Sequence, residues 1–101
     1  TNSLFISHPK SWWFLNESSS MDRVVPKGSL LLIDPASHVR SGDIVLIEAG
    51  GDGMIVRRIF CEESLLTLHA ESNDRDFGDI HIERGEARVI GKVVAFSSED
   101  I

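Results

Sequence analysis

Short runs of apolar and β-branched residues, each ended by turn-forming residues, set the strongest limit on how this chain can fold. Such runs predict strands when Gly, Pro, Asp and Ser separate them. Seven ranges qualify: Ser11–Leu15, Ser29–Asp34, Asp43–Ala49, Met54–Phe60, Ser64–His69, Asp79–Glu83 and Ala87–Phe96. No segment of helical length keeps a 3.6-residue apolar period, and only Ser20–Val24 could form a turn of helix. The pattern predicts a mostly-β fold of twisted antiparallel sheets with little or no helix.

The clearest hairpin signal is "GGDG", which separates "IVLIEA" from "MIVRRIF". Glycine adopts positive φ without a steric penalty, so this stretch suits a tight turn between two paired strands. We therefore expect Asp43–Ala49 and Met54–Phe60 to be neighbours in the sheet.

The chain has 101 residues, of which 42% are hydrophobic and 26% charged. These values fit one globular domain with a modest core, spanning residues 1–101. The first residues lack an initiator Met and enter strand-like sequence almost at once. We expect the domain to be excised from a longer chain.

Charge and composition exclude several classes of protein. A formal net charge of −6 disfavours direct binding to nucleic acid, which requires clustered Lys and Arg. The single Cys61 allows no internal disulfide, and four scattered histidines form no ligand motif, so we expect neither metal nor cofactor. No apolar run approaches the ~18 residues of a membrane span. We expect a soluble, cytoplasmic protein without a membrane anchor.

The strand Met54–Phe60 contains two adjacent arginines, Arg57 and Arg58. Alternate residues of a strand point to opposite faces, so each arginine shares its face with apolar neighbours. We expect one of the two to be partly buried and to bind carboxylate or carbonyl groups. An ion pair within the domain or at a subunit contact is favoured over phosphate binding.

Five motifs occur in an order that resembles a known family. They are "SSSM", "PKGSLLLIDP", "VRSGDIVLIEA", "GMIVRRI" and "ARVIGKVVAF". Together they resemble the C-terminal domain of the LexA/UmuD family, which includes self-cleaving SOS repressors and lambda-type phage repressors. The lead-in "HPKSWWFLNESSSM" is similar to that of UmuD. Bacterial signal peptidases share this fold but carry a membrane anchor.

The resemblance implies a Ser-Lys dyad in which Ser20 occupies the position of the nucleophile. The lysine that acts as its base maps to Arg57 in "IVRRI". A buried lysine can lose its proton, whereas the guanidinium of arginine, with a pKa above ~12, stays protonated. We therefore expect Ser20 to lack a general base and the peptidase to be inactive, although whether Arg57 is natural or engineered stays open.

Other departures from the family pattern also indicate an inactive peptidase. Ser18 stands where the family usually has glycine, and the first Gly-Asp is replaced by Gly28-Ser29, while Gly42-Asp43 is intact. The family cuts its own chain at an Ala-Gly or Cys-Gly bond upstream of the nucleophile. The only such pair here is Ala49-Gly50, which lies downstream. None of the lysines that could replace the missing base, Lys10, Lys27 and Lys92, falls on the strand expected to face Ser20.

Some residues have simpler structural interpretations. Trp12, Trp13 and Phe14 predict one strand with aromatic side chains on both faces, one tryptophan in the core and the other under a loop or at an interface. A peptide-binding surface is the functional alternative. Cys61 is expected to be a small apolar filler.

The last predicted strand is long and strongly β-forming. If this strand lies at a sheet edge, it exposes unpaired backbone groups that can pair with a second copy. The resemblance also implies dimerisation through the last strands. We predict a homodimer or higher oligomer with an interface at Val89, Ile90, Gly91, Lys92, Val93, Val94, Ala95 and Phe96.

The sequence thus favours the dimerisation and regulatory domain of a phage-type or SOS-type transcriptional repressor. Operator DNA would be bound by a helix-turn-helix domain preceding Thr1. Repression would be relieved by an antirepressor or by proteolysis in trans, and an antirepressor or a RecA-type inducer is the expected protein partner. Two alternatives stay open. One is an active self-cleaving domain trapped by replacement of its lysine, and the other is a UmuD-like accessory protein of a translesion polymerase.

Overall fold

The computed structural model describes residues 8–97, and seven strands account for most of its regular structure. They are β1 (Trp12–Leu15), β2 (Leu30–Asp34), β3 (Ile44–Ala49), β4 (Met54–Cys61), β5 (Leu65–His69), β6 (Ile80–Glu83) and β7 (Ala87–Ser97). Each agrees with its predicted range to within one residue at either end. Within the described range, two short 3₁₀ turns, η1 (Gly50–Asp52) and η2 (Arg84–Glu86), are the only helical elements, so the mostly-β prediction is confirmed.

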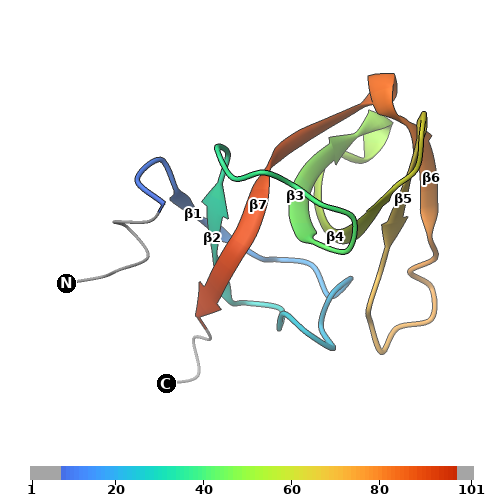
Figure 1. Ribbon diagram of the computed structural model, residues 1–101. Coiled ribbons are helices and arrows are strands. Elements are labelled where there is room, and N and C mark those ends of the chain that lie inside the picture. Colours follow the sequence, from blue (N-terminus) through green and yellow to red (C-terminus); the bar gives the residue numbers. More distant parts are fainter. Residues whose placement is uncertain (1–7, 98–101) are drawn as a thin grey trace.

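All seven strands belong to one antiparallel sheet in the order β1-β2-β7-β3-β4-β5-β6. Figure 1 shows β1 and β2 on one side of the molecule, β3 to β6 curled together on the other, and β7 crossing between them. The "GGDG" stretch connects β3 to β4 as expected, and η1 forms within it. Gly50 and Gly53 there have positive φ, which explains the glycines.

The last strand lies inside the sheet. Its first half pairs with β3 up to Lys92, and its second half pairs with β2 from Lys92 to Ser97. Both ladders are interrupted by a β-bulge, one between Leu46 and Ile47 and one between Leu32 and Ile33. Bulges bend a strand and increase its twist, which lets β7 leave β3 and join β2. In the sheet order β7 is therefore an inner strand and not the outermost one, but each half pairs on one side and only Lys92 pairs with both β2 and β3.

A single glycine permits the close approach of β7 to β2. A Cβ added at Gly91 would lie 2.6 Å from Cγ2 of Ile33 and 3.0 Å from the backbone carbonyl of Asp34. Only a residue without a side chain fits this close approach.

Two hydrophobic cores form on opposite faces of β3 and β4. The first core contains Met21, Val25, Leu31, Ile33, Leu46 and Val56. The second core contains Val45, Ile47, Ala49, Ile59, Leu66 and Leu68. The period-two alternation of β3 sends Leu46 to the first core and its two neighbours to the second. Cys61 packs partly buried against the second core, as an apolar filler does.

The prediction that one tryptophan lies in the core is wrong. Trp12 is 38% exposed and Trp13 is 43% exposed, because β1 is an edge strand of the sheet. Of the three aromatic residues, Phe14 packs against the first core, and its ring meets that of Trp12 edge to face at 6.1 Å.

Candidate functional site

The segment between β1 and β2 folds around one buried amide side chain. Asn16 is 1% exposed, and its Nδ2 donates to the carbonyl oxygens of Val25 at 3.4 Å and Pro26 at 3.1 Å. Its Oδ1 accepts from the backbone N–H of Ser18 at 3.2 Å. Such side-chain bonds replace the ladder bonds that a coil segment lacks. Asn16 therefore closes residues 16–29 into a compact loop.

The serines of this loop have local structural partners. The hydroxyl of Ser18 accepts from the backbone N–H of Ser20 at 3.1 Å, and the hydroxyl of Ser29 donates to the carbonyl of Pro26. Met21 is fully buried in the first core beside Val25. The apolar residue after Ser20 thus anchors the turn, and this anchoring holds Ser20 against the sheet.

Ser20 is buried, with 3% of its surface exposed. Its Oγ donates to the backbone carbonyl of Val56 in β4 at 3.0 Å. A carbonyl oxygen accepts a hydrogen bond but does not remove the proton, so this contact leaves the hydroxyl in its weakly nucleophilic form.

Arg57, the next residue along β4, is 6% exposed, which confirms that one of the paired arginines is buried. Its Nη1 donates to the carbonyl oxygens of Gly78 at 2.8 Å and Leu68 at 3.3 Å. Its guanidinium carbon lies 5.7 Å from the centre of the Phe77 ring. These are the carbonyl and cation–π contacts that a buried guanidinium requires. They position Arg57 toward the loop between β5 and β6.

Arg58 occupies the opposite face of β4 and forms the ion pair that the sequence predicts. Its Nε and Nη2 both approach Oε1 of Glu71, at 2.9 and 2.8 Å, and its Nη1 donates to the carbonyl of Gly42 at 2.6 Å. Arg58 therefore connects the loop before β3 to the loop after β5.

The loop of residues 70–79 lies against the turn that carries Ser20. The backbone N–H of Glu71 donates to the carbonyl of Ser20 at 3.0 Å, and the N–H of Arg23 donates to the carbonyl of Glu71 at 3.0 Å. The N–H of Asn73 donates to Oδ1 of Asp22 at 2.9 Å. Arg58 binds this loop near its start and Arg57 near its end. The two arginines therefore help to hold residues 70–79 over the turn that carries Ser20.

The chain that holds Ser20 between β4 and residues 70–79 is similar to a known family. A protein-family model described as "Peptidase S24-like" matches residues 2–94, which is most of the chain. The chain belongs to the Peptidase S24-like family. A search of curated proteins gives no match. Family membership confirms the resemblance to the LexA/UmuD fold.

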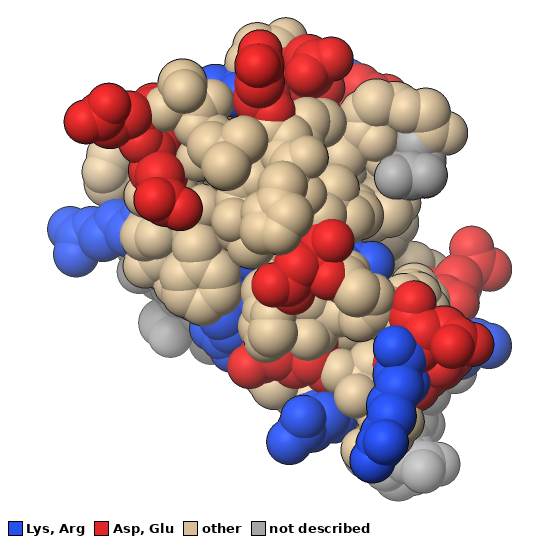
Figure 2. Space-filling view, turned by 90° about the vertical axis from the view of Figure 1, so that its right-hand side faces the viewer, with Lys and Arg blue, Asp and Glu red and all other residues tan. Residues whose placement is uncertain are grey.

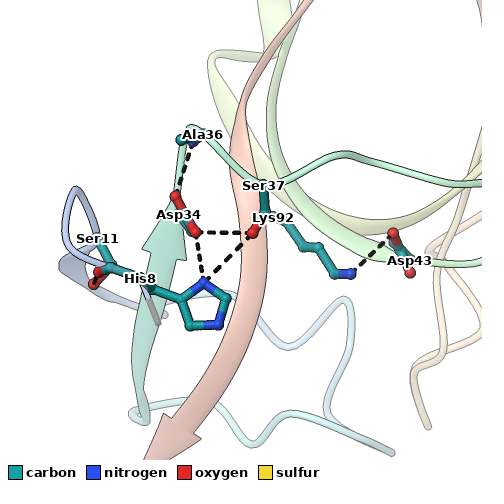
Figure 3. Close-up of polar contacts among 7 residues, drawn as sticks. All are labelled: His8, Ser11, Asp34, Ala36, Ser37, Asp43 and Lys92. Atoms are coloured by element: carbon teal, nitrogen blue, oxygen red, sulfur yellow. Dashed lines mark hydrogen bonds and ion pairs between the residues drawn. The ribbon is translucent and has the colours of Figure 1, made fainter. Parts of the chain in front are cut away.

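In this S24-like domain the described lysines have positions unsuited to activating Ser20. The Nζ of Lys92 lies 3.4 Å from Oδ2 of Asp43, and Figure 3 shows its side chain extended toward that carboxylate. Burial raises the pKa of Asp43, but the N–H of Arg40 and the ammonium of Lys92 outweigh this effect and leave the pKa lowered. Lys10 and Lys27 are exposed.

The S24-like fold also holds a polar cluster that sequence reasoning missed. Oδ2 of Asp34, at the end of β2, accepts from Ser37 Oγ at 2.8 Å and lies 2.6 Å from Nδ1 of His8 (Figure 3). The N–H of Ala36 donates to Oδ1 of Asp34 at 2.8 Å. The contacts with His8, Ser37 and Ala36 lower the pKa of Asp34 from 3.8 to about 2. "LIDPAS" carries an Asx-turn signal, but nothing in the sequence pairs it with His8.

A groove of about 230 Å³ runs beside β4. It is lined by residues 14–18 on one side and by Met54, Ile55 and Val56 on the other. β4 pairs with β5 only from Arg58 onward, so Met54–Arg57 has β3 on one side and lies before the β5 ladder on the other. The groove therefore follows the edge of β4 that Ser20 binds.

Within residues 8–97 no group of three or more His, Cys, Asp or Glu side chains is arranged to hold a metal ion. The same part of the chain contains no helix with the length and apolarity needed to cross a bilayer.

Proposed function

We propose that this S24-like domain is the dimerisation and regulatory domain of a phage-type or SOS-type transcriptional repressor, and that it lacks peptidase activity. The contact from Ser20 Oγ to the Val56 carbonyl carries this proposal. In the family arrangement a neutral lysine would accept that proton, and Arg57, which the motif resemblance puts at the lysine position, keeps a permanent charge. The burial of Ser20 further limits its access to a peptide bond.

Self-cleavage gives the direct test. We expect the full-length protein to stay intact at alkaline pH, where an uncharged lysine would be available in an active relative. The Arg57→Lys variant tests whether this one side chain prevents self-cleavage. The double variant Arg57→Lys with Ser20→Ala is its matched control, because it lacks the Ser20 hydroxyl. A fragment from the parent protein that disappears in Ser20→Ala would refute the inactive dyad, as would rapid labelling of Ser20 by a fluorophosphonate.

We propose that the domain dimerises through the second half of β7. Residues 93–97 pair with β2 on one side and lie beyond the end of the β3 ladder on the other. A cleft of about 370 Å³, lined by Val25, Ile44 and residues 93–96, follows this side of the strand. Phe96 is 45% exposed beside it. An unpaired strand side next to apolar surface suits antiparallel pairing with a second copy.

Sedimentation of two matched variants tests the dimer. Phe96→Asp should give monomers, because it places a charge at the proposed interface. Phe60→Asp changes an equally exposed aromatic residue on another strand and should leave the dimer intact. If both variants remain dimeric, the interface lies elsewhere.

The preceding part of the reading frame distinguishes a repressor from the alternatives. A helix-turn-helix domain ahead of Thr1 would support operator binding by a symmetric dimer. A short arm alone would support a UmuD-like polymerase accessory protein. A genomic lysine codon at position 57 would support the trapped active peptidase.

A further inference from the structure

The outward surface of β4, β5 and β6 forms a regular grid of side chains that contributes to neither core. Cross-strand pairing aligns Phe60 with Thr67 and Thr67 with His81, and it aligns Leu65 with Glu83. We call this surface the outer face; it consists of Phe60, Leu65, Thr67, His69, His81 and Glu83.

The outer face combines exposed apolar groups with ordered polar groups. Phe60 is 40% exposed, and its ring meets that of His69 edge to face at 6.2 Å. His69 Nδ1 lies 2.7 Å from Oδ1 of Asp79, and Thr67 Oγ1 lies 3.1 Å from Nδ1 of His81. Cross-strand contacts of this kind fix the side chains before a partner arrives, which lowers the entropy lost on binding.

The face ends at an open strand edge. β6 is the last strand of the sheet order, and within the described residues it pairs only with β5. Its inward side chains, Ile80 and Ile82, already pack against the second core, so the strand is held in place. An edge strand fixed by its own core can receive an additional strand through backbone hydrogen bonds.

The negative charge around the outer face limits which molecules can bind to it. Residues 58–86 contain eight carboxylates and three arginines, so they carry five of the six net negative charges of the chain. Arg58 is paired with Glu71, and Arg84 donates to the backbone carbonyls of Glu62 and Glu63. In Figure 2, which faces this side of the molecule, red carboxylates border a broad uncharged area. A second copy of this face and nucleic acid are both repelled by the same charge.

We propose that the outer face and the β6 edge dock a protein partner that presents an extended, lysine- or arginine-rich segment. The segment would pair with β6 as an eighth strand, with basic side chains on the outer face beside Glu83 and the neighbouring carboxylates, and apolar side chains on the opposite face beside Ile82. Such docking is separate from the β7 interface and does not require that the domain be a repressor.

A synthetic peptide tests this proposal with the 101-residue chain. The probe is an eight-residue peptide of alternating Lys and Val, titrated into ¹⁵N-labelled protein while amide shifts are recorded. The expected shifts centre on β6 and extend to its neighbour Leu65–His69. A peptide of equal charge with alternate prolines, which cannot extend a sheet, should bind far more weakly.

Two variants of equal charge change locate the site. Glu83→Lys should weaken binding by about fivefold or more, whereas Glu17→Lys, an exposed residue of the loop after β1, should weaken it by less than about twofold. Both positions are on the surface, and circular dichroism checks that both variants fold.

Four results of the peptide titrations would overturn the proposal. They are equal binding by both variants, equal binding of the proline peptide, shifts centred on β1 or β7, and no shifts at millimolar peptide. Loss of the dimer in Phe60→Asp would also overturn it, because the outer face would then belong to the interface between copies.

Discussion

The two cores share β3 and β4 but are closed by different kinds of chain. Every member of the second core lies on β3, β4 or β5, so this core is made by the sheet curling on itself. The first core depends on two residues of a loop, Met21 and Val25, which cover one face of the sheet without forming a regular element. The position of Ser20 is therefore determined by loop packing. The loop of residues 70–79 is held by the two arginines and by hydrogen bonds to the Ser20 turn.

The largest expected effect comes from truncating each core at a fully buried position. Met21→Ala and Leu68→Ala should each lower the free energy of unfolding by about 2–5 kcal/mol, because both leave a cavity. Only Met21→Ala should also increase amide exchange at residues 16–29, since Met21 anchors that loop. Urea denaturation and hydrogen exchange measure the two effects. Equal deprotection of the loop in Leu68→Ala would show that the cores do not act separately.

A smaller effect is expected where β7 meets β2, at the border of the first core. Gly91→Ala should cost about 1–3 kcal/mol, because the added Cβ would lie 2.6 Å from Ile33 Cγ2 and would force the strands apart. Gly51→Ala is the matched control, since a Cβ there meets nothing within 4 Å. Thermal unfolding compares the two. If Gly91→Ala is as stable as Gly51→Ala, the pairing of β7 with β2 does not require a glycine at position 91.

The arginine pair allows a direct comparison of the two faces of β4. Arg57→Met should destabilise the protein by about 1–3 kcal/mol, because it removes the guanidinium donor from a buried contact with the Leu68 carbonyl and a partly buried one with the Gly78 carbonyl. Arg58→Met should cost about 1 kcal/mol or less, since its ion pair with Glu71 is partly solvated. Urea midpoints measure both. A larger loss of stability in Arg58→Met than in Arg57→Met would show that Arg58 contributes more to the stability of the fold.

The smallest expected effect is confined to acid pH and to Asp34, at the end of β2. Because its pKa in the folded protein is about 2, below the ordinary 3.8, its contribution to stability is complete above 3.8 and is lost as the pH falls toward 2. Asp34→Asn should remove this part of the pH dependence, whereas Glu17→Gln should retain it. Urea midpoints at stepwise pH values check the difference. An unchanged acid profile in Asp34→Asn would contradict the lowered pKa.

The sequence predicts the strands well because their signals are local. β-branched runs and turn residues locate all seven strands, and alternation predicts the burial of one arginine of the pair. Family resemblance adds the expected fold, which the match over residues 2–94 supports.

The contacts that the sequence could not predict are long-range. Nothing local indicates that β7 is inserted between β2 and β3, so the sequence leaves open whether this strand lies at a sheet edge. The exposure of Trp12 and Trp13 follows from the edge position of β1, which composition does not reveal. The pairing of His8 with Asp34 joins residues 26 positions apart, and the covering of the Ser20 turn by residues 70–79 joins still more distant ones.

The central place of β7 has a consequence for how the protein acquires its structure. Before residues 87–97 leave the ribosome, no backbone ladder joins the ribbon of β1 and β2 to the meander of β3 to β6, and the two are linked through the loop that carries Ser20. Both fragments expose apolar surface until the closing strand arrives, and long-range pairing of this kind slows folding. Chaperone capture or aggregation of nascent chains should therefore be most sensitive to changes that delay synthesis of these eleven residues.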